Sequence, residues 1–183
     1  MPTRKPFAVA NWKMAMTIAD SPAFIRQFTD RVGPSAEHVE VVLCPPYTAL
    51  HPVAQVLAGS PVQLGGQNLF TAVGTAHTGE MSTKLLADVG CEWVMGGHWE
   101  VRRRMLETDR DVNEKLRAAL QVGLRPILLV GEGTNGGGED AVAERLPTLF
   151  GQLKATQVKE MAVVYEPEWT IGVDEPAPPA PPD

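Results

Sequence analysis

The chain has 183 residues, of which 44% are hydrophobic and 21% charged, and its formal net charge is -6. These values are typical of a globular domain with a sizeable core, and the acidic balance argues against a nucleic-acid-binding surface. The sequence has no apolar run near the roughly 20 residues that cross a bilayer, and no apolar segment follows its first residues. Cys44 and Cys91 have neither CxxC nor zinc-ligand spacing. We therefore expect a cytoplasmic protein with reduced, buried cysteines and with no membrane or nucleic-acid partner.

Short apolar segments of strand character alternate with longer segments of helical character along the chain. The expected strands are Phe7–Asn11, Glu40–Cys44, Val62–Gln67, Trp93–Gly97, Ile127–Gly131 and Met161–Glu166. The expected helices are Ser21–Arg31, Ala49–Leu57, Ser82–Asp88, Arg110–Gln121 and Ala141–Leu153. Several of the strands are almost continuously apolar, which is typical of parallel strands covered on both faces. Six strands that alternate with helices predict a parallel α/β fold built from βα units.

Polar side chains follow the ends of the expected strands. They are Asn11 and Lys13, Gln67 and Asn68, His98 and Glu100, Glu132, and Glu166. The C-terminal ends of parallel strands meet on one face of an α/β fold, and that face carries the functional site. A polar loop could account for any one pair, but the turns that lead from helices into strands carry no comparable cluster. The sequence therefore predicts a site on this face.

Two segments are rich in glycine or proline. Residues 174–183 read DEPAPPAPPD, and half of them are proline, which predicts an extended or disordered tail after a domain that spans residues 1–173. Gly133–Gly138 reads GTNGGG and is not followed by the Lys-Ser/Thr of a phosphate-binding P-loop. A dinucleotide-binding doubly wound sheet would need GxGxxG after the first strand, where this chain has Asn-Trp-Lys-Met.

Several short motifs occur in a fixed order over almost the whole chain. They are Asn11-Trp12-Lys13-Met14, Gly66-Gln67-Asn68, Thr78-Gly79-Glu80, Gly97-His98, Glu107-Thr108-Asp109, Val130-Gly131-Glu132, Tyr165-Glu166-Pro167 and Trp169-Thr170-Ile171-Gly172. In this order and spacing, the chain resembles the triosephosphate isomerase family of (βα)8 barrels. The resemblance implies an α/β fold of the TIM-barrel family that is incomplete here, with about six βα units present and the seventh and eighth strands missing.

The resemblance also implies the chemistry of the predicted site. Members of the family interconvert an aldose and a ketose phosphate through an enediol(ate), and a Glu base paired with a neutral His electrophile is their known arrangement. Carried over by position, Glu166 is the base and His98 polarises the substrate carbonyl. Lys13 supplies positive charge to the phosphate and the developing oxyanion, and Asn11 hydrogen-bonds substrate oxygens.

Further roles follow from the same resemblance. Glu100 is expected to hold Lys13 by an ion pair, and the backbone N–H of Gly172 is expected to contact the substrate phosphate when a lid loop closes. The loop Leu69–Thr78 keeps the length of the family's dimerisation loop, which implies a homodimer. The alternative for this loop is a solvent-exposed Gly/Thr loop. Neither a metal ion nor an organic cofactor is implied.

The chain departs from the family pattern at three positions near the predicted site. Trp99 stands where the family has Ser, so it removes a partner of the catalytic glutamate and adds a large side chain. Val101 replaces an Arg whose partner would be Glu107. Glu168 replaces an apolar residue in the lid hinge, two positions from Glu166, where a second carboxylate could raise the pKa of the base or point to water.

The predicted function is that of a triose-phosphate isomerase acting on glyceraldehyde 3-phosphate and dihydroxyacetone phosphate. One alternative is an isomerase of a related phosphosugar, which the three departures favour. Another is a truncated protein of the same family that no longer catalyses. Because the last two strands and their phosphate-binding loops are missing, we expect the chain alone to be weakly active or inactive and easily destabilised.

Overall fold

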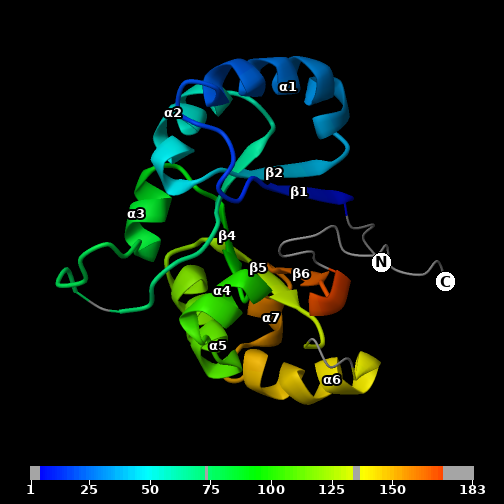
Figure 1. Cartoon of the computed structure of the whole chain (residues 1–183). Helices are drawn as coiled ribbons and strands as arrows, with labels where there is room; N and C mark the ends of the chain where they lie inside the picture. The colour runs from blue at the N-terminus through cyan, green and yellow to red at the C-terminus, as the bar shows by residue number, and fades with distance from the viewer. Residues whose placement is uncertain (1–4, 73, 134–136, 171–183) are drawn as a thin grey trace. The chain divides into compact units, whose positions relative to one another are not determined.

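A computed structural model describes residues 5–72, 74–133 and 137–170. The chain divides into two compact units (Figure 1): unit 1 contains residues 1–95 and 118–125, and unit 2 contains residues 96–117 and 126–183. The predicted tail 174–183, Gly172 and residues 134–136 of the glycine-rich segment lie outside the described residues. The single domain 1–173 therefore stays a prediction.

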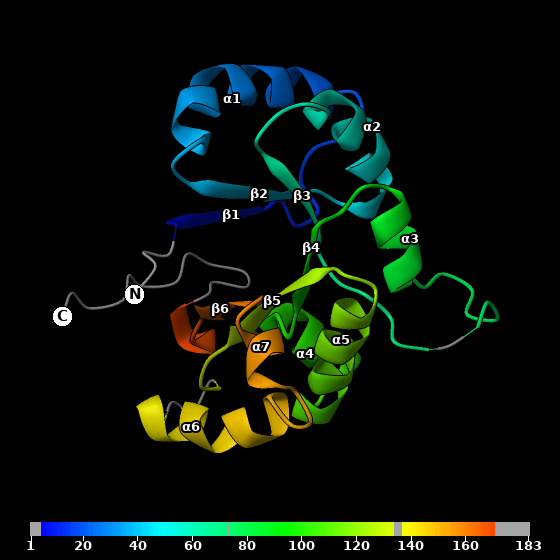
Figure 2. The same cartoon turned by 180° about the vertical axis from the view of Figure 1, so that it is seen from behind.

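Unit 1 is built from βα units. Its elements are β1 (Phe7–Asn11), α1 (Ser21–Ala36), β2 (Glu40–Cys44), α2 (Tyr47–Leu57), β3 (Gln63–Gly66), α3 (Thr83–Asp88) and β4, which runs Trp93–Gly96 and ends at the boundary with unit 2. Neighbouring strands pair in parallel in chain order, with Phe7 opposite Glu40 and Gly65 opposite Trp93. In both views α1, in dark blue, runs along β1 and β2 (Figures 1 and 2).

The core of unit 1 lies between its strands and helices. Ile25 of α1, Leu43 of β2 and Leu86 of α3 are fully or almost fully buried in one apolar cluster. Cys44 and Cys91 are free and buried, as expected. Burial raises the pKa of each of these thiols to about 12, so both remain neutral at physiological pH.

Unit 2 continues the same alternation of helices and strands. Its elements are α4 (Trp99–Met105), α5 (Asp109–Gln121, whose last turn belongs to unit 1), β5 (Arg125–Val130), α6 (Gly138–Leu149), α7 (Ala155–Val158), β6 (Ala162–Tyr165) and the 3-10 helix η1 (Glu168–Thr170). β5 and β6 pair in parallel, with Val130 opposite Tyr165. In both views α7 lies between β6 and α6 (Figures 1 and 2).

The observed helices correct several sequence-based expectations. α4 and α7 were not expected, because each is shorter than eight residues and has too few apolar positions to show a helical period. α1 continues past Arg31 through Gly33 and Pro34 to Ala36, which is 1% exposed. α6 runs 138–149 rather than 141–153.

Across residues 5–72, 74–133 and 137–170, no helix is both long enough and apolar enough to cross a bilayer.

Candidate active site

The end of β1 carries two of the predicted site residues, Asn11 and Lys13, both in unit 1. The side-chain oxygen of Asn11 accepts the backbone N–H of Lys13 at 2.9 Å, and Lys13 has a φ of 52°. The side-chain amide of Gln67 donates to the backbone oxygens of Lys13 at 2.8 Å and of Cys44 at 3.0 Å. The backbone that bears the Lys13 ammonium is thus held at the ends of β1, β2 and β3.

His98 is the N-terminal cap of α4 and is 5% exposed. Its Nδ1 accepts the backbone N–H of Glu100 at 3.2 Å, so the ring proton lies on Nε2. Nε2 faces Glu166, with 3.7 Å between this nitrogen and the carboxylate oxygen Oε2. A helix N-terminus disfavours a positive charge on the imidazole. The structure therefore brings His98 and Glu166 together within unit 2, with Nε2 of the imidazole facing the carboxylate.

We expect the neutral tautomer of His98 to carry its proton on Nε2, because Nδ1 is occupied as an acceptor. Long-range nitrogen–proton NMR in weakly alkaline buffer distinguishes the two tautomers. The exposed His51 of α2 serves as a control, since it is expected to show the mixture of an unconstrained imidazole. A proton found on Nδ1 of His98 would contradict this arrangement.

Glu166 directly follows β6, and its position depends on a close contact between backbones. Its N–H donates to the oxygen of Val130 at 2.9 Å. A Cβ on Gly131 would lie 2.2 Å from the backbone oxygen of Glu166, so only glycine allows the ends of β5 and β6 to approach this closely. The Glu166 side chain is 27% exposed as a whole, but Oε2, the oxygen that faces His98, is fully enclosed.

Glu132 organises the segment after Glu166, a role that the sequence did not reveal. It is buried, and its carboxylate accepts the hydroxyl of Tyr165 at 2.7 Å and the indole N–H of Trp169 at 2.8 Å. The Trp169 hydrogen bond, with a further contribution from Tyr165, holds the pKa of Glu132 below its usual value. Its backbone oxygen also accepts the N–H of Glu168 at 3.1 Å. The only signal in the sequence was a carboxylate directly after a buried strand.

An ion-pair cluster supports the end of β5. The Asp109 carboxylate accepts hydrogen bonds from Arg102 and Arg145, each with a shortest distance of 2.7 Å. Arg145 also donates to the backbone oxygen of Gly131, and Arg102 donates through Nε to that of Gly97 at 2.8 Å. Through the two arginines, the Asp109 carboxylate is therefore linked to the backbone of Gly97, which precedes His98, and to the backbone of Gly131, which lies against Glu166.

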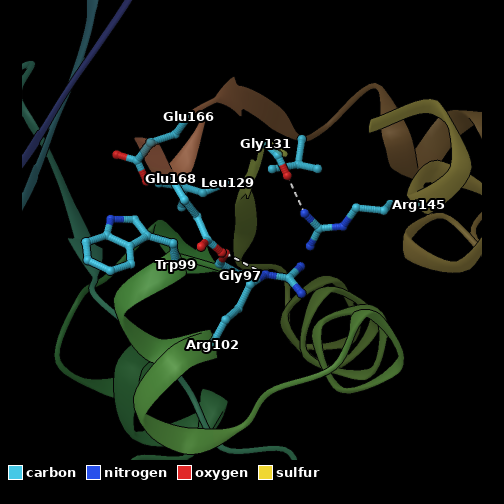
Figure 3. Close-up of a pocket in the computed structure, with 9 residues that line it drawn as sticks. Gly97, Trp99, Arg102, Leu129, Gly131, Arg145, Glu166 and Glu168 are labelled. Atoms are coloured by element: carbon cyan, nitrogen blue, oxygen red, sulfur yellow. Dashed lines mark hydrogen bonds between the residues drawn. The ribbon is translucent and has the colours of Figure 1, made fainter. Parts of the chain in front are cut away.

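The three departures from the family pattern have different structural outcomes. Trp99 and Glu168 line the same pocket as Glu166 (Figure 3). Val101 does not leave Glu107 without a cation, because the ammonium of Lys115 pairs with that carboxylate, and both side chains are buried. Lys115 thus provides the positive charge that the sequence-based interpretation found missing at position 101.

The remaining predicted residues have separate outcomes. Glu100 places Oε2 at 3.8 Å from Nδ1 of His98, so it lies in unit 2 beside the histidine. Its expected ion pair with Lys13, and the meeting of Asn11 and Lys13 with His98 and Glu166, stay predictions. The contact of Gly172 with phosphate concerns a residue outside the described parts of the chain.

Comparisons with known proteins agree on one family. The family model described as triosephosphate isomerase matches residues 6–183. A triosephosphate isomerase of Chloroflexus aurantiacus is 39% identical over 181 residues, which cover 97% of this chain and 72% of the relative. One of Symbiobacterium thermophilum is 44% identical over 174 residues, which cover 92% of this chain and 67% of the relative.

A solved structure supports the same relationship. The triosephosphate isomerase of Bartonella henselae matches with a TM-score of 0.81 and 29% identity, over 91% of this chain and 70% of that one. The incomplete TIM-barrel fold expected from the sequence is thereby confirmed.

Proposed function

This chain belongs to the triosephosphate isomerase family, and on that premise we propose that Glu166 and His98 perform the proton transfer of its reaction. The activity of the chain is the interconversion of glyceraldehyde 3-phosphate and dihydroxyacetone phosphate. The observation that carries the proposal is the distance of 3.7 Å between Nε2 of the neutral His98 and Oε2 of Glu166. A base and a neutral donor this close can act on two adjacent substrate atoms, one carbon-bound proton and one carbonyl oxygen.

The proposed steps follow from these two side chains. The Glu166 carboxylate removes a proton from the carbon next to the carbonyl, while the Nε2–H of His98 donates to the carbonyl oxygen and stabilises the developing enediolate. His98 delivers its Nε2 proton to that oxygen and takes up the proton of the neighbouring hydroxyl, whose oxygen becomes the new carbonyl oxygen, and Glu166 returns its proton to the carbon that bore the original carbonyl. Lys13 and Asn11 are proposed to bind the phosphate and substrate oxygens, which is supported by their place at the end of a parallel strand.

Exchange of the carbon-bound proton tests this mechanism directly, because it reports proton abstraction even where net turnover is slow. We expect the chain to catalyse exchange of dihydroxyacetone phosphate protons for deuterium in D2O, followed by proton NMR. His98→Asn is expected to slow the catalysed exchange about 100-fold. His51→Asn, which changes an exposed histidine in unit 1, is the matched control and is expected to retain the rate. Catalysed exchange that is unchanged in His98→Asn would contradict the proposal.

A related phosphosugar is the second candidate substrate. Trp99 and Glu168 line the pocket beside Glu166 and differ from the family pattern there, so they favour a substrate whose carbon chain differs from that of a triose. Exchange measured in parallel with triose and tetrose phosphates separates the two candidates by their relative kcat/KM.

We also propose that the protein is a cytoplasmic homodimer that uses the loop Leu69–Thr78. The family relationship supports this assembly. Within the described part of this loop, Phe70 forms an isolated β-bridge with Ser82, and the Phe70 ring lies 5.1 Å from the ring of His77.

A further inference from the structure

Arg145 of α6 uses all three nitrogens of its guanidinium in hydrogen bonds within unit 2. Nε and Nη2 donate to the Asp109 carboxylate, with shortest distances of 3.1 and 2.7 Å, and Nη1 donates to the backbone oxygen of Gly131. In the view of Figure 3, Gly131 lies between Arg145 and Glu166. Because the guanidinium is a rigid plane, it cannot turn away from Gly131 without also breaking its bidentate pair with Asp109.

The Asp109 carboxylate that orients Arg145 is itself held in place. Its Oδ1 also accepts Nη1 of Arg102 at 2.7 Å, and Arg102 donates through Nε to the backbone oxygen of Gly97 at 2.8 Å. The side chains of the three charged residues are each more than three quarters buried. The guanidinium of Arg145 therefore has a fixed support, which is the carboxylate at the start of α5.

Gly131 carries this restraint to the backbone of Glu166. A Cβ on Gly131 would lie 2.2 Å from the backbone oxygen of Glu166 and 2.7 Å from the backbone nitrogen of Pro167, so the two main chains pack directly against each other. On the other side of its Cα, the N–H of Glu166 donates to the oxygen of Val130 at 2.9 Å. The backbone on both sides of the Glu166 Cα therefore rests on the tip of β5, and a shift of that tip would move the carboxylate.

We propose that Arg145 is a positioning residue for Glu166: by holding the Gly131 carbonyl, it fixes the tip of β5 against the backbone that carries the Glu166 carboxylate. This inference rests on the proposed role of Glu166 as base. Oε2 of that carboxylate is enclosed and lies 3.7 Å from Nε2 of His98. Proton transfer depends steeply on such a distance, since a misplacement of about 1 Å can cost about 100-fold in rate.

The first test compares NMR signals and needs no turnover. Arg145→Lys keeps the charge but replaces the planar fork with a single point donor, so it cannot hold Asp109 and Gly131 at the same time. We expect the backbone N–H signal and the carboxyl carbon signal of Glu166 to shift in this variant. Arg117→Lys, at a half-buried arginine of α5 in the same unit, is the matched control and is expected to leave both signals in place. Unchanged Glu166 signals in a folded Arg145→Lys chain overturn the proposal.

The second test measures the deuterium exchange of dihydroxyacetone phosphate. Arg145→Lys is expected to lower kcat for exchange about 10-fold and to leave KM within a factor of two, because the variant displaces the base and not the groups proposed to bind the phosphate. Arg145→Met, which removes the donor and the charge together, is a second variant with the same expected result. Circular dichroism checks that each variant is folded. A kcat equal to that of Arg117→Lys in a folded variant overturns the proposal.

A double substitution distinguishes positioning of Glu166 from a general loss of structure. In a chain that already carries Glu166→Gln, Arg145→Lys is expected to lower the remaining catalysed rate less than twofold, because Arg145 acts through Glu166. An equal loss of about 10-fold in both backgrounds overturns the proposal, because the effect of Arg145 would then not pass through Glu166.

The readouts separate this inference from the proposed function. Shifted Glu166 signals in Arg145→Lys, together with an exchange rate that Glu166→Gln leaves unchanged, support the positioning contact and contradict the role of Glu166 as base. A rate that is lost in Glu166→Gln but kept in Arg145→Lys gives the reverse result.

Discussion

Replacing Glu166 with Gln is expected to lower the rate of proton exchange and of net isomerisation about 1000-fold, while the fold is retained. The amide has nearly the same shape as the carboxylate but cannot accept a proton, so the step that forms the enediolate loses its base. The effect should appear in kcat more than in KM, because the substrate does not depend on this carboxylate for its binding. Steady-state kinetics in both directions, together with the deuterium exchange, measure it.

Glu144→Gln is the matched control for this substitution. Glu144 is exposed on α6, and its replacement removes the same charge from the same unit. We expect kcat to remain within a factor of two of the unmodified value, as for most surface substitutions. Equal rates in Glu166→Gln and Glu144→Gln would refute the assignment of the base.

Replacing Asp109 with Asn is expected to lower the free energy of unfolding by about 2 to 3 kcal/mol. The change leaves the guanidinium groups of Arg102 and Arg145 facing each other without their shared carboxylate. Burial alone would raise the pKa of Asp109, but hydrogen bonds from Arg145 and the charge of Arg102 outweigh burial and lower it from its ordinary value of 3.8. Urea unfolding followed by circular dichroism measures the loss of stability.

The same substitution has a predictable dependence on pH. A carboxylate whose pKa is depressed by folding contributes stability that is fully present above its unfolded value and is lost as the pH falls through its folded value. The difference between the two chains should therefore be constant above about pH 5 and shrink below about pH 4. Asp88→Asn, at an exposed position of α3, is the control and is expected to cost less than about 0.5 kcal/mol. A difference that grows towards acid would contradict the ion-pair explanation.

The βα repeat could be read from the sequence because its strands are almost continuously apolar. The expected strands Phe7–Asn11 and Glu40–Cys44 both have the observed bounds. In Glu40–Cys44 the four residues after Glu40 are buried, which leaves a strong signal in a short segment, whereas half-buried and exposed residues alternate along Phe7–Asn11. The helices were less predictable at their ends. α4 begins with Trp99 and contains three consecutive arginines, so its seven residues show no apolar period.

The residues of the candidate site were also only partly predictable from the sequence. His98 and Glu166 could be named from motifs, and each follows a strand end, which is a local property of the chain. The role of Glu132 could not be predicted in this way, because its partners Tyr165 and Trp169 lie 33 and 37 residues further along the chain. The role of Lys115 could not be predicted either, because several cations lie near Glu107 in the sequence and the pattern does not say which of them pairs with it. Contacts of this kind are decided by packing and not by local pattern.

The close approach at Gly131 means that the spacing between the tips of two adjacent strands is set by a single hydrogen atom. A side chain at position 131 would push away the main-chain carbonyl of Glu166, the residue that carries the proposed base. The orientation of the Glu166 carboxylate consequently depends on Gly131, a residue on the neighbouring strand tip that has no side chain and takes no part in the chemistry.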